Sequence, residues 1–176
     1  MTTNTTTKKT TSRTRKTPAK TTPKSKEIKK LPPNPFMNEI LDLVHEQDNE
    51  EDKVKILQQY ANDALKTLLI WNYDESIISL LPTGEVPYQP NESPLGVDHS
   101  SLRRDYKNLY NFVKGGNDSL SKIRRETIFI QILESLHPNE ADVLVLVKDK
   151  KLEDKYDISF EVVKQAYPDI VWGNRS

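Results

Sequence analysis

The sequence predicts an all-α fold: a compact helical domain of about six to seven helices that follows a disordered basic tail. Apolar residues recur at helical spacing from Phe36 onward, and segments rich in Gly and Pro separate the helical stretches. The first 30 residues contain almost no apolar side chain. We therefore predict a tail over residues 1–30, a Pro-rich linker over 31–35 and a helical domain over 36–176.

The predicted tail lacks the apolar side chains that a folded core requires. Met1, Ala19 and Ile28 are the only apolar residues in segment 1–30. Burying them could not offset an ordering cost of about 1–2 kcal/mol per residue. The Thr, Ser, Lys and Pro content of the segment is similar to that of linker-histone tails. We expect this segment to be disordered.

A net charge of zero conceals two segments of opposite charge. Segment 1–30 has one acidic residue, Glu27, and a net charge of +9. Of the chain's 26 basic and 26 acidic side chains, the other 16 and 25 lie in residues 31–176, which gives that part −9. A basic arm of this kind is typical of proteins that bind a polyanion. The tail cations expected to contact nucleic acid are Lys8, Lys9, Arg13, Arg15, Lys16, Lys20, Lys24, Lys26, Lys29 and Lys30.

Periodicity and helix-stop signals predict the elements of the domain in order. Proline fixes φ and disfavours helix at the preceding residue, so the linker should be extended. Helices are expected over residues 36–44, around 54–60 behind the acidic run 48–52, and over 63–71. Acidic residues at a helix start favour its dipole. A short apolar piece at 77–81 ends at Pro82, and the Pro- and Gly-containing residues 82–99 should form an ordered surface loop.

Four further segments are expected to be helical. Ser100 or Ser101 should cap a helix that ends at Gly115 and Gly116 and buries Leu102, Tyr106, Leu109 and Val113. Helices should follow over 119–136 and 159–166. Residues 141–147 alternate as a strand would, but their flanks suit helix ends, and we predict a helix.

Composition and motifs argue against several functional classes. The chain has no cysteine, which excludes disulfides, thiolate metal sites and a cysteine nucleophile. The N-terminal segment lacks an apolar stretch and no apolar run is long enough to cross a membrane, so we expect no signal peptide and a soluble, intracellular protein. Phosphate-binding, metalloprotease, calcium-loop and serine-hydrolase motifs are absent. We expect a protein that is not an enzyme and uses no cofactor or metal.

Candidate metal ligands have simpler interpretations. The histidines His45, His99 and His137 are far apart in sequence and are expected at surface or helix-end positions. The acidic run that includes Asp48 and Asp52 could hold Mg²⁺, but a solvated helix start explains it more simply.

A second basic cluster is the candidate site of the domain. Its cations face only Asp105, Asp118 and Glu126, which leaves a local charge of +4. Backbone N–H groups near Ser119 and Ser121 would lie beside these arginines and suit a phosphate backbone. The alternative is an ordinary charged face paired with the acidic first half. The cluster comprises Arg103, Arg104, Lys107, Lys114, Lys122, Arg124 and Arg125.

Five aromatic residues raise a similar choice between function and structure. Their side chains could stack on nucleic-acid bases, although aromatics at helical spacing more often belong to a core. They are Trp71, Tyr73, Tyr106, Tyr110 and Phe112.

Several sequence blocks are similar to an uncharacterised family encoded by T4-like phages of marine bacteria, of the DUF6433 type. The similarity covers about residues 34–176 and rests on residues 71–73, 81–88, 101–104, 109–116, 123–127 and 133–138. It implies a viral protein in a bacterial cytoplasm and no particular activity.

The order of features also resembles the helical N-terminal DNA-binding domain of T4-type ATP-dependent DNA ligases. The similar positions are residues 36–44, 53–57, 65–66, 142–144, Ile158 and 167–170. This resemblance implies a domain that grips duplex DNA across its backbone. The chain lacks the Lys-x-Asp-Gly motif, so ligase activity is not implied.

Together these features lead us to expect a phage-encoded, non-enzymatic accessory protein that binds duplex DNA without sequence specificity. The alternative is an interaction or virion-assembly protein whose acidic helical body docks a phage or host protein. Its partners would then include a phage replication or structural protein. We expect the protein in the host bacterial cytoplasm or in the virion, without a membrane partner.

Overall fold

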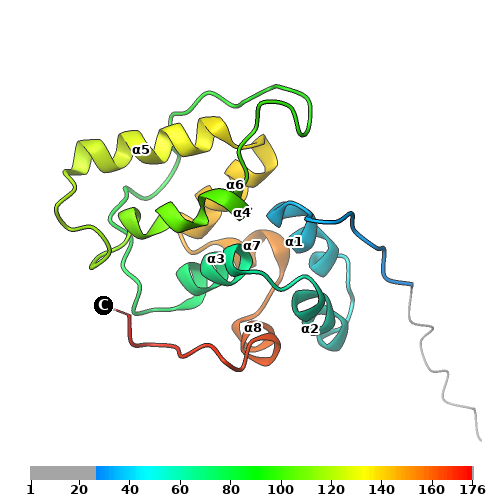
Figure 1. The fold of residues 1–176 in the computed structure, drawn as a ribbon. Helices are drawn as coiled ribbons and strands as arrows, with labels where there is room; N and C mark the ends of the chain where they lie inside the picture. Colours follow the sequence, from blue (N-terminus) through cyan, green and yellow to red (C-terminus); the bar gives the residue numbers. More distant parts are fainter. Residues whose placement is uncertain (1–26, 176) are drawn as a thin grey trace, which may run out of the picture.

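The computed structural model describes residues 27–175, which form eight α-helices and one 3-10 helix without a β-strand (Figure 1). The predicted all-α fold class is therefore confirmed. The elements are α1 Met37–His45, α2 Glu50–Gln59, α3 Asp63–Tyr73, α4 Leu102–Asp105, η1 Tyr106–Phe112, α5 Lys122–Ser135, α6 Pro138–Lys148, α7 Leu152–Tyr156 and α8 Phe160–Ala166. The predicted disordered tail falls almost entirely on residues 1–26, which lie outside the described residues, and it stays a prediction.

Asparagine side chains cap the N-termini of helices α2 and α3. Asn49 accepts a hydrogen bond from the N–H of Asp52 at 2.8 Å, and Asn62 accepts one from the N–H of Leu65 at 2.9 Å. Such caps satisfy backbone donors that have no partner within the helix. Because α2 starts at Glu50, three residues of the acidic run, Glu50, Glu51 and Asp52, form its first turn instead of preceding it.

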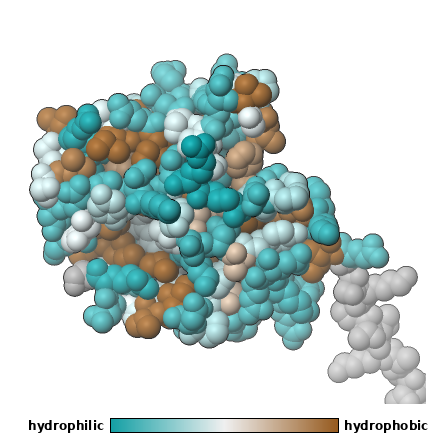
Figure 2. Space-filling view, in the orientation of Figure 1, coloured by the Kyte–Doolittle hydropathy of each residue, from teal (hydrophilic) through white to brown (hydrophobic). Residues whose placement is uncertain are grey.

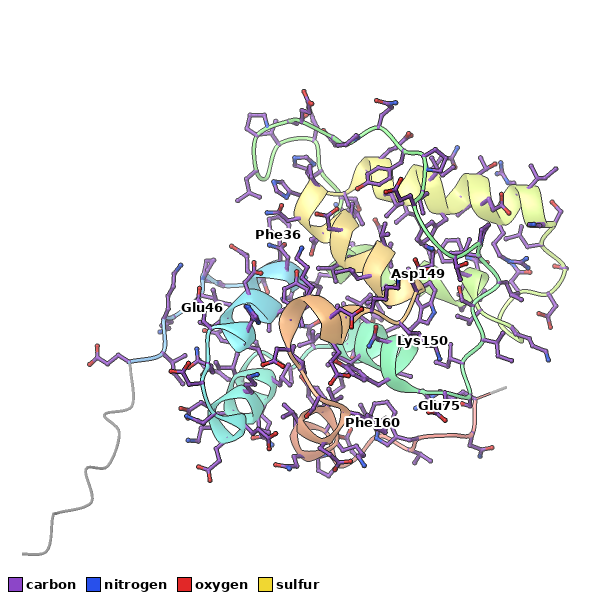
Figure 3. All side chains as sticks on the ribbon, turned by 180° about the vertical axis from the view of Figure 1, so that it is seen from behind. Phe36, Glu46, Glu75, Asp149, Lys150 and Phe160 are labelled. Atoms are coloured by element: carbon purple, nitrogen blue, oxygen red, sulfur yellow. The ribbon has the colours of Figure 1, made fainter. Side chains whose placement is uncertain are left out.

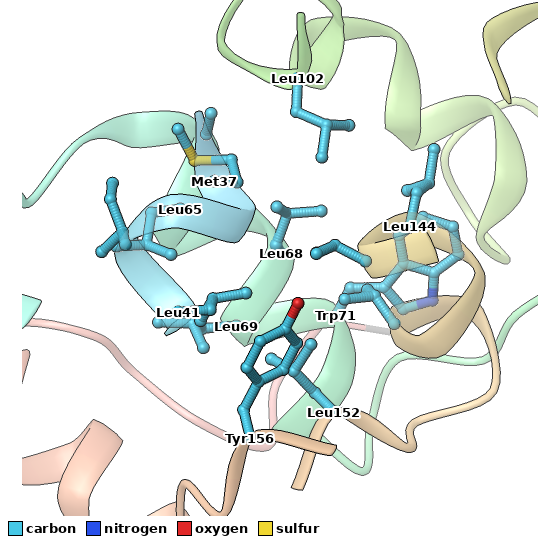
Figure 4. Close-up of a cluster of buried hydrophobic side chains, with 14 of the residues drawn as sticks. Met37, Leu41, Leu65, Leu68, Leu69, Trp71, Leu102, Leu144, Leu152 and Tyr156 are labelled. Carbon is cyan, nitrogen blue, oxygen red and sulfur yellow. The ribbon is translucent and has the colours of Figure 1, made fainter. Parts of the chain in front are cut away.

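The hydrophobic core lies where α1, α3 and α6 pack together (Figure 4). Leu41 of α1, Leu65 and Leu69 of α3 and Leu144 of α6 are fully buried there. Each buried leucine side chain stabilises the fold by about 1.5–3 kcal/mol relative to its exposed state. Helices α2 and α8 contact each other beside this core, so the second and last helices of the domain are tied together.

Glu140 joins three helices in the centre of the domain. Its side chain is fully buried, and its two carboxylate oxygens each accept a backbone N–H at 2.9 Å, one from Met37 and one from Leu102. These residues are the first in α1 and α4. One carboxylate therefore satisfies the starts of two helices at once. Burial raises the pKa of Glu140, against the opposing effect of the two hydrogen bonds.

Lys148 anchors the loop 82–99, which contains no helix, as predicted. Its buried ammonium group donates hydrogen bonds to the carbonyls of Pro82 at 2.7 Å and Gly84 at 3.1 Å, and it pairs with Asp149 at 2.5 Å. Figure 3 shows Asp149 and Lys150 at the C-terminal end of α6. Lys150 donates a hydrogen bond to the carbonyl of Asp74 at 2.7 Å. The end of α6 thus holds two distant chain segments.

The predicted helix between Ser101 and the glycine pair is wrong in its second half. Only α4 is α-helical, and η1 continues it as a 3-10 helix. Tyr106, Leu109 and Phe112 recur every three residues, and a 3-10 helix places such residues on one side. Phe112 is fully buried in place of the expected Val113, which is partly exposed.

The later helices follow the prediction with shifted starts. Residues 141–147 are helical within α6, where Pro138 occupies the first turn and the His137 side chain accepts the N–H of Asn139 at 3.2 Å. Helix α5 begins at Lys122 because Ser121 caps it, three residues later than predicted. The short helix α7 was not predicted. Within residues 27–175, no helix is long and apolar enough to cross a membrane.

Candidate nucleic-acid interface

The predicted basic cluster spans α4, η1, the loop 113–121 and the start of α5. Arg103 is half-buried and Arg125 is buried, whereas the other five cations are exposed. We call these five the basic strip: Arg104, Lys107, Lys114, Lys122 and Arg124. The loop lies at the left of Figure 1, and residues 27–36 leave the domain at the right. Lys29 and Lys30, both exposed, are therefore at the opposite end of the domain from the loop.

Arg125 organises the loop 113–121. The side chain is 6% exposed, and its guanidinium donates to the carbonyls of Asn111 at 2.8 Å, Asn117 at 3.1 Å and Leu120 at 3.0 Å. The Asn117 amide also donates to the Asn111 side chain at 2.8 Å. These bonds engage Nε and Nη2, and the side chain is buried, so Arg125 is not presented to a phosphate as the prediction expected. Arg125 positions the loop instead.

The two glycines of the loop have separate conformational requirements. Gly115 has a φ of +82°, which L side chains rarely adopt, and its N–H donates to Asp118 at 3.0 Å. A Cβ atom on Gly116 would lie 1.9 Å from the carbonyl oxygen of Tyr110. Only glycine allows the chain to approach η1 this closely. The pair therefore turns the chain back onto η1.

A short extended segment holds the beginning of the loop from the other side. The N–H of Lys114 donates to the carbonyl of Ile78 at 2.9 Å, and the N–H of Leu80 donates to the carbonyl of Phe112 at 2.8 Å. Ser79 and Val113 form an isolated antiparallel bridge between these bonds. The backbone around Lys114 is thus fixed while its side chain stays exposed.

Arg103, unlike the five cations of the basic strip, is half-buried and contacts the linker. Its guanidinium donates to the carbonyl of Pro35 at 3.0 Å, which ties the start of α4 to the linker. Arg103 therefore fastens the linker to the domain.

Among the described residues 27–175, most cations of the basic strip form no ion pair. Lys122 lies 3.9 Å from Glu126 in an exposed pair, which contributes little. Lys107 lies over the ring of Tyr106 at 6.0 Å. Arg104, Lys114 and Arg124 form no ion pair with any residue of the described chain. The arrangement can bind an anion without first breaking an internal ion pair.

The aromatic candidates divide between core and surface. Trp71 and Phe112 are buried, and their rings stack with centroids 6.3 Å apart. Tyr73 is partly buried, and its hydroxyl donates to the carbonyl of Ile158. Tyr110 is 52% exposed, so it is the aromatic candidate best placed to meet a ligand.

The histidines have structural partners. His45 donates to the carbonyl of Tyr156 at 3.0 Å. The rings of His99 and His137 meet edge to face with centroids 5.3 Å apart, although they are far apart in sequence. Burial lowers the pKa of His137, the charge of His99 adds to this effect, and Glu39 opposes it. His137 is therefore neutral at pH 7, which suits its place as the cap of α6.

The acidic candidate for Mg²⁺ belongs to a helix start. Asp52 accepts from Asn49 and pairs with Lys55 at 2.9 Å, contacts that lower its pKa. In the described part of the chain, no group of three or more acidic or histidine side chains could hold a metal ion.

Two features of this end of the domain were missed from the sequence. Ile123 is 79% exposed between the cations Lys122 and Arg124. Arg175, near the end of the chain, lines a cavity beside η1. Figure 2 shows apolar surface over this side of the domain, divided by hydrophilic side chains. No local pattern distinguishes either residue, because Ile123 fits a helical stripe and Arg175 is remote in sequence.

Comparison with known proteins places the chain in a family. Neither a curated protein nor a solved structure matches it. A family of unknown function, DUF6433, matches residues 40–154, which include the basic strip and most of the helical domain. The chain belongs to the DUF6433 family.

Proposed function

We propose that this protein is a non-enzymatic, DNA-associated accessory protein that binds the nucleic-acid backbone without sequence specificity. The basic strip is the observation that carries the proposal. Arg125 and the segment 77–81 hold the backbone of residues 111–120, which carries Lys114 and leads into Lys122 and Arg124. Within residues 27–175 most of these charges have no ionic partner.

Cations held in this way favour phosphate binding. Each phosphate that they neutralise releases counterions, so the logarithm of affinity falls with the logarithm of salt concentration by about 0.9 per contact. Phosphate contacts position a protein on a duplex but carry no sequence information. The predicted tail would add its ten cations to the same electrostatic attraction.

The origin and the ligase likeness are part of this proposal. A phage-encoded protein would act in the host bacterial cytoplasm or in the virion. A domain like the N-terminal domain of DNA ligases would grip duplex DNA across its backbone. The exposed Lys114 and Arg124 are the residues that would make such contacts here.

The acidic end of the domain supports a second candidate function. Asp42 of α1, Glu46 directly after it, and Glu50 and Glu51 of α2 are all exposed. A surface of this charge repels DNA and would suit a basic protein partner. In that case the domain docks a phage or host protein, and only the tail touches nucleic acid.

Fluorescence anisotropy with a labelled DNA duplex tests the proposal. The full chain and residues 31–176 are titrated over a salt series, each with and without the paired substitutions Lys114→Glu and Arg124→Glu. We expect residues 31–176 to bind, with a measurable salt slope. The paired reversal should weaken that binding at least tenfold, because four units of charge change at the strip.

A matched double reversal on the α2–α8 side provides the control. Lys55→Glu and Lys164→Glu change the net charge equally, but both lysines already pair with acidic residues, Asp52 and Glu161. This variant should bind nearly as the parent does. Binding by the full chain alone, with none by residues 31–176, would assign the domain to protein docking.

A further inference from the structure

A cavity opens between α3 and η1, on the end of the domain that carries the basic strip. Its volume is about 330 Å³, and it is open to solvent. Pockets for small ligands commonly have about 300–1,000 Å³. Lys107 and Tyr110 of η1 form one wall, and Trp71 of α3 faces them from the opposite element. The cavity therefore has the size of a ligand site and shares Lys107 with the strip.

Aromatic side chains line much of this cavity. Trp71 is held by its stack on Phe112, and its indole Nε1–H has no hydrogen-bond partner among residues 27–175. Tyr106 lines the cavity and donates a long hydrogen bond of 3.5 Å to Asp63. The exposed Tyr110 completes the aromatic lining. Trp71 is 2% exposed, so the rings open to a flat aromatic ligand are those of Tyr106 and Tyr110.

Two cations line the same cavity. Lys107 forms no ion pair within the described residues. Arg175 is oriented by a buried carboxylate: its Nε donates to Asp74 at 3.2 Å, and its Nη2 donates to the carbonyl of Val171 at 3.0 Å. Asp74 in turn accepts the N–H of Ser76 at 2.9 Å. One edge of the guanidinium is thereby fixed, and its Nη1 donors remain available to an anion.

We infer that this cavity binds an unpaired nucleobase of a single-stranded nucleic acid, with the adjoining phosphate against Lys107 and Arg175. The inference rests on the proposed function and extends it, because it names unpaired strands as the preferred ligand. Aromatic walls accept any base by stacking. The strip continues from Lys107 to Lys114 along the same chain segment, so the neighbouring phosphates of one strand have cations to follow.

Fluorescence of the full chain reports binding directly at Trp71. The substitution Trp172→Phe leaves Trp71 as the sole tryptophan. A short oligothymidine strand should quench this signal and bind more tightly than a duplex of equal length. Tyr110→Ala should weaken strand binding about tenfold and leave duplex affinity unchanged, because it removes a stacking face but no charge. Tyr110→Phe keeps the ring and should retain strand binding.

The outcomes separate this inference from the proposed function. Duplex binding that persists without any quenching by the strand overturns the inference alone. Loss of binding to both strand and duplex overturns the proposed function as well. Quenching by thymidine monophosphate as strong as that by the strand assigns the cavity to free nucleotides, and equal quenching by an oligoglutamate peptide assigns it to a protein partner. Either result overturns the inference.

Discussion

The acidic and basic ends of the domain hold their charged side chains differently. At the acidic end, Asp52 and Glu39 accept backbone or side-chain hydrogen bonds at the starts of their own helices. At the basic end, the buried Arg125 guanidinium donates hydrogen bonds to backbone carbonyls. Lys114 and Arg124, in contrast, have no ionic partner in residues 27–175. Asp52 and Glu39 thus build structure locally, while Asp42, Glu46, Glu50 and Glu51 stay exposed; at the basic end one buried cation orders the loop that carries Lys114.

This difference shows why charge content alone is a poor guide to a binding site. Both ends are rich in one sign of charge, but a group already engaged by the protein must break that contact before it binds a ligand. The energetic case for a site is strongest where the backbone is fixed and the charge is unpaired. In this domain that combination occurs at the basic strip.

The largest expected effect on stability comes from removing the Glu140 carboxylate, which joins the starts of α1 and α4. Glu140→Ala leaves the buried N–H groups of Met37 and Leu102 without acceptors and opens a cavity. We expect the free energy of unfolding to fall by about 4 kcal/mol, measured by urea denaturation. Glu134→Ala is the control, because Glu134 accepts a single exposed hydrogen bond from Gln89. Equal losses in both variants would contradict the joining role of Glu140.

The pH dependence of this effect has a defined sign. Burial raises the pKa of Glu140 in the folded protein. The folded state therefore binds this proton more tightly than the unfolded state, and the contribution of Glu140 to stability falls as the pH rises through the folded pKa. Glu140→Gln removes the titrating group. Between acidic and neutral pH, the free energy of unfolding of this variant should therefore fall less steeply than that of the parent. An unchanged dependence on pH would show that Glu140 does not titrate with a raised pKa.

Adjacent arginines provide the next test, because Arg124 and Arg125 have the same chemistry and different surroundings. Arg125→Met removes the donors for three backbone carbonyls and should cost about 3 kcal/mol of stability. Arg124→Met should change stability by less than about 0.5 kcal/mol. Thermal unfolding measures both variants, and a stable Arg125→Met protein would show that the loop does not depend on this side chain.

The smallest expected effects distinguish the two glycines of the basic end. Gly116→Ala places a Cβ atom against the Tyr110 carbonyl and should destabilise the domain by about 2 kcal/mol. Gly115→Ala meets no atom within 4 Å and only strains the backbone at positive φ, so about 1 kcal/mol is expected. Urea denaturation of the pair gives the order directly. The reverse order would mean that the loop relaxes easily around position 116.

Much of the fold could be predicted from local signals. Residues 141–147 were correctly assigned to a helix because their flanks carry helix-start and helix-end residues, despite the strand-like alternation of valines. Helix α7 escaped prediction because its five residues are too few to show a period. The 3-10 helix η1 was mistaken for an α-helix, since periods of 3.0 and 3.6 residues differ little over seven residues.

The candidate site was predictable as a stretch but not residue by residue. The glycine pair and the flanking cations marked residues 103–125 as unusual. The neighbouring sequence does not show that Arg125 is structural and Arg124 exposed. The Arg125 guanidinium is buried because the folded chain places three backbone carbonyls around it. Arg103 likewise depends on a contact with Pro35 that is remote in sequence.

The sequence by itself determined the division of charge, the helical class, the long loop and the absence of thiol chemistry. These properties follow from composition and from interactions between near neighbours in the chain. Only the tertiary structure decided which cations are exposed, how Glu140 joins α1 to α4, and that Trp71, Tyr110 and Arg175 line one cavity. Such arrangements depend on contacts between distant residues, because burial and hydrogen-bond partners are set by packing and not by chain order.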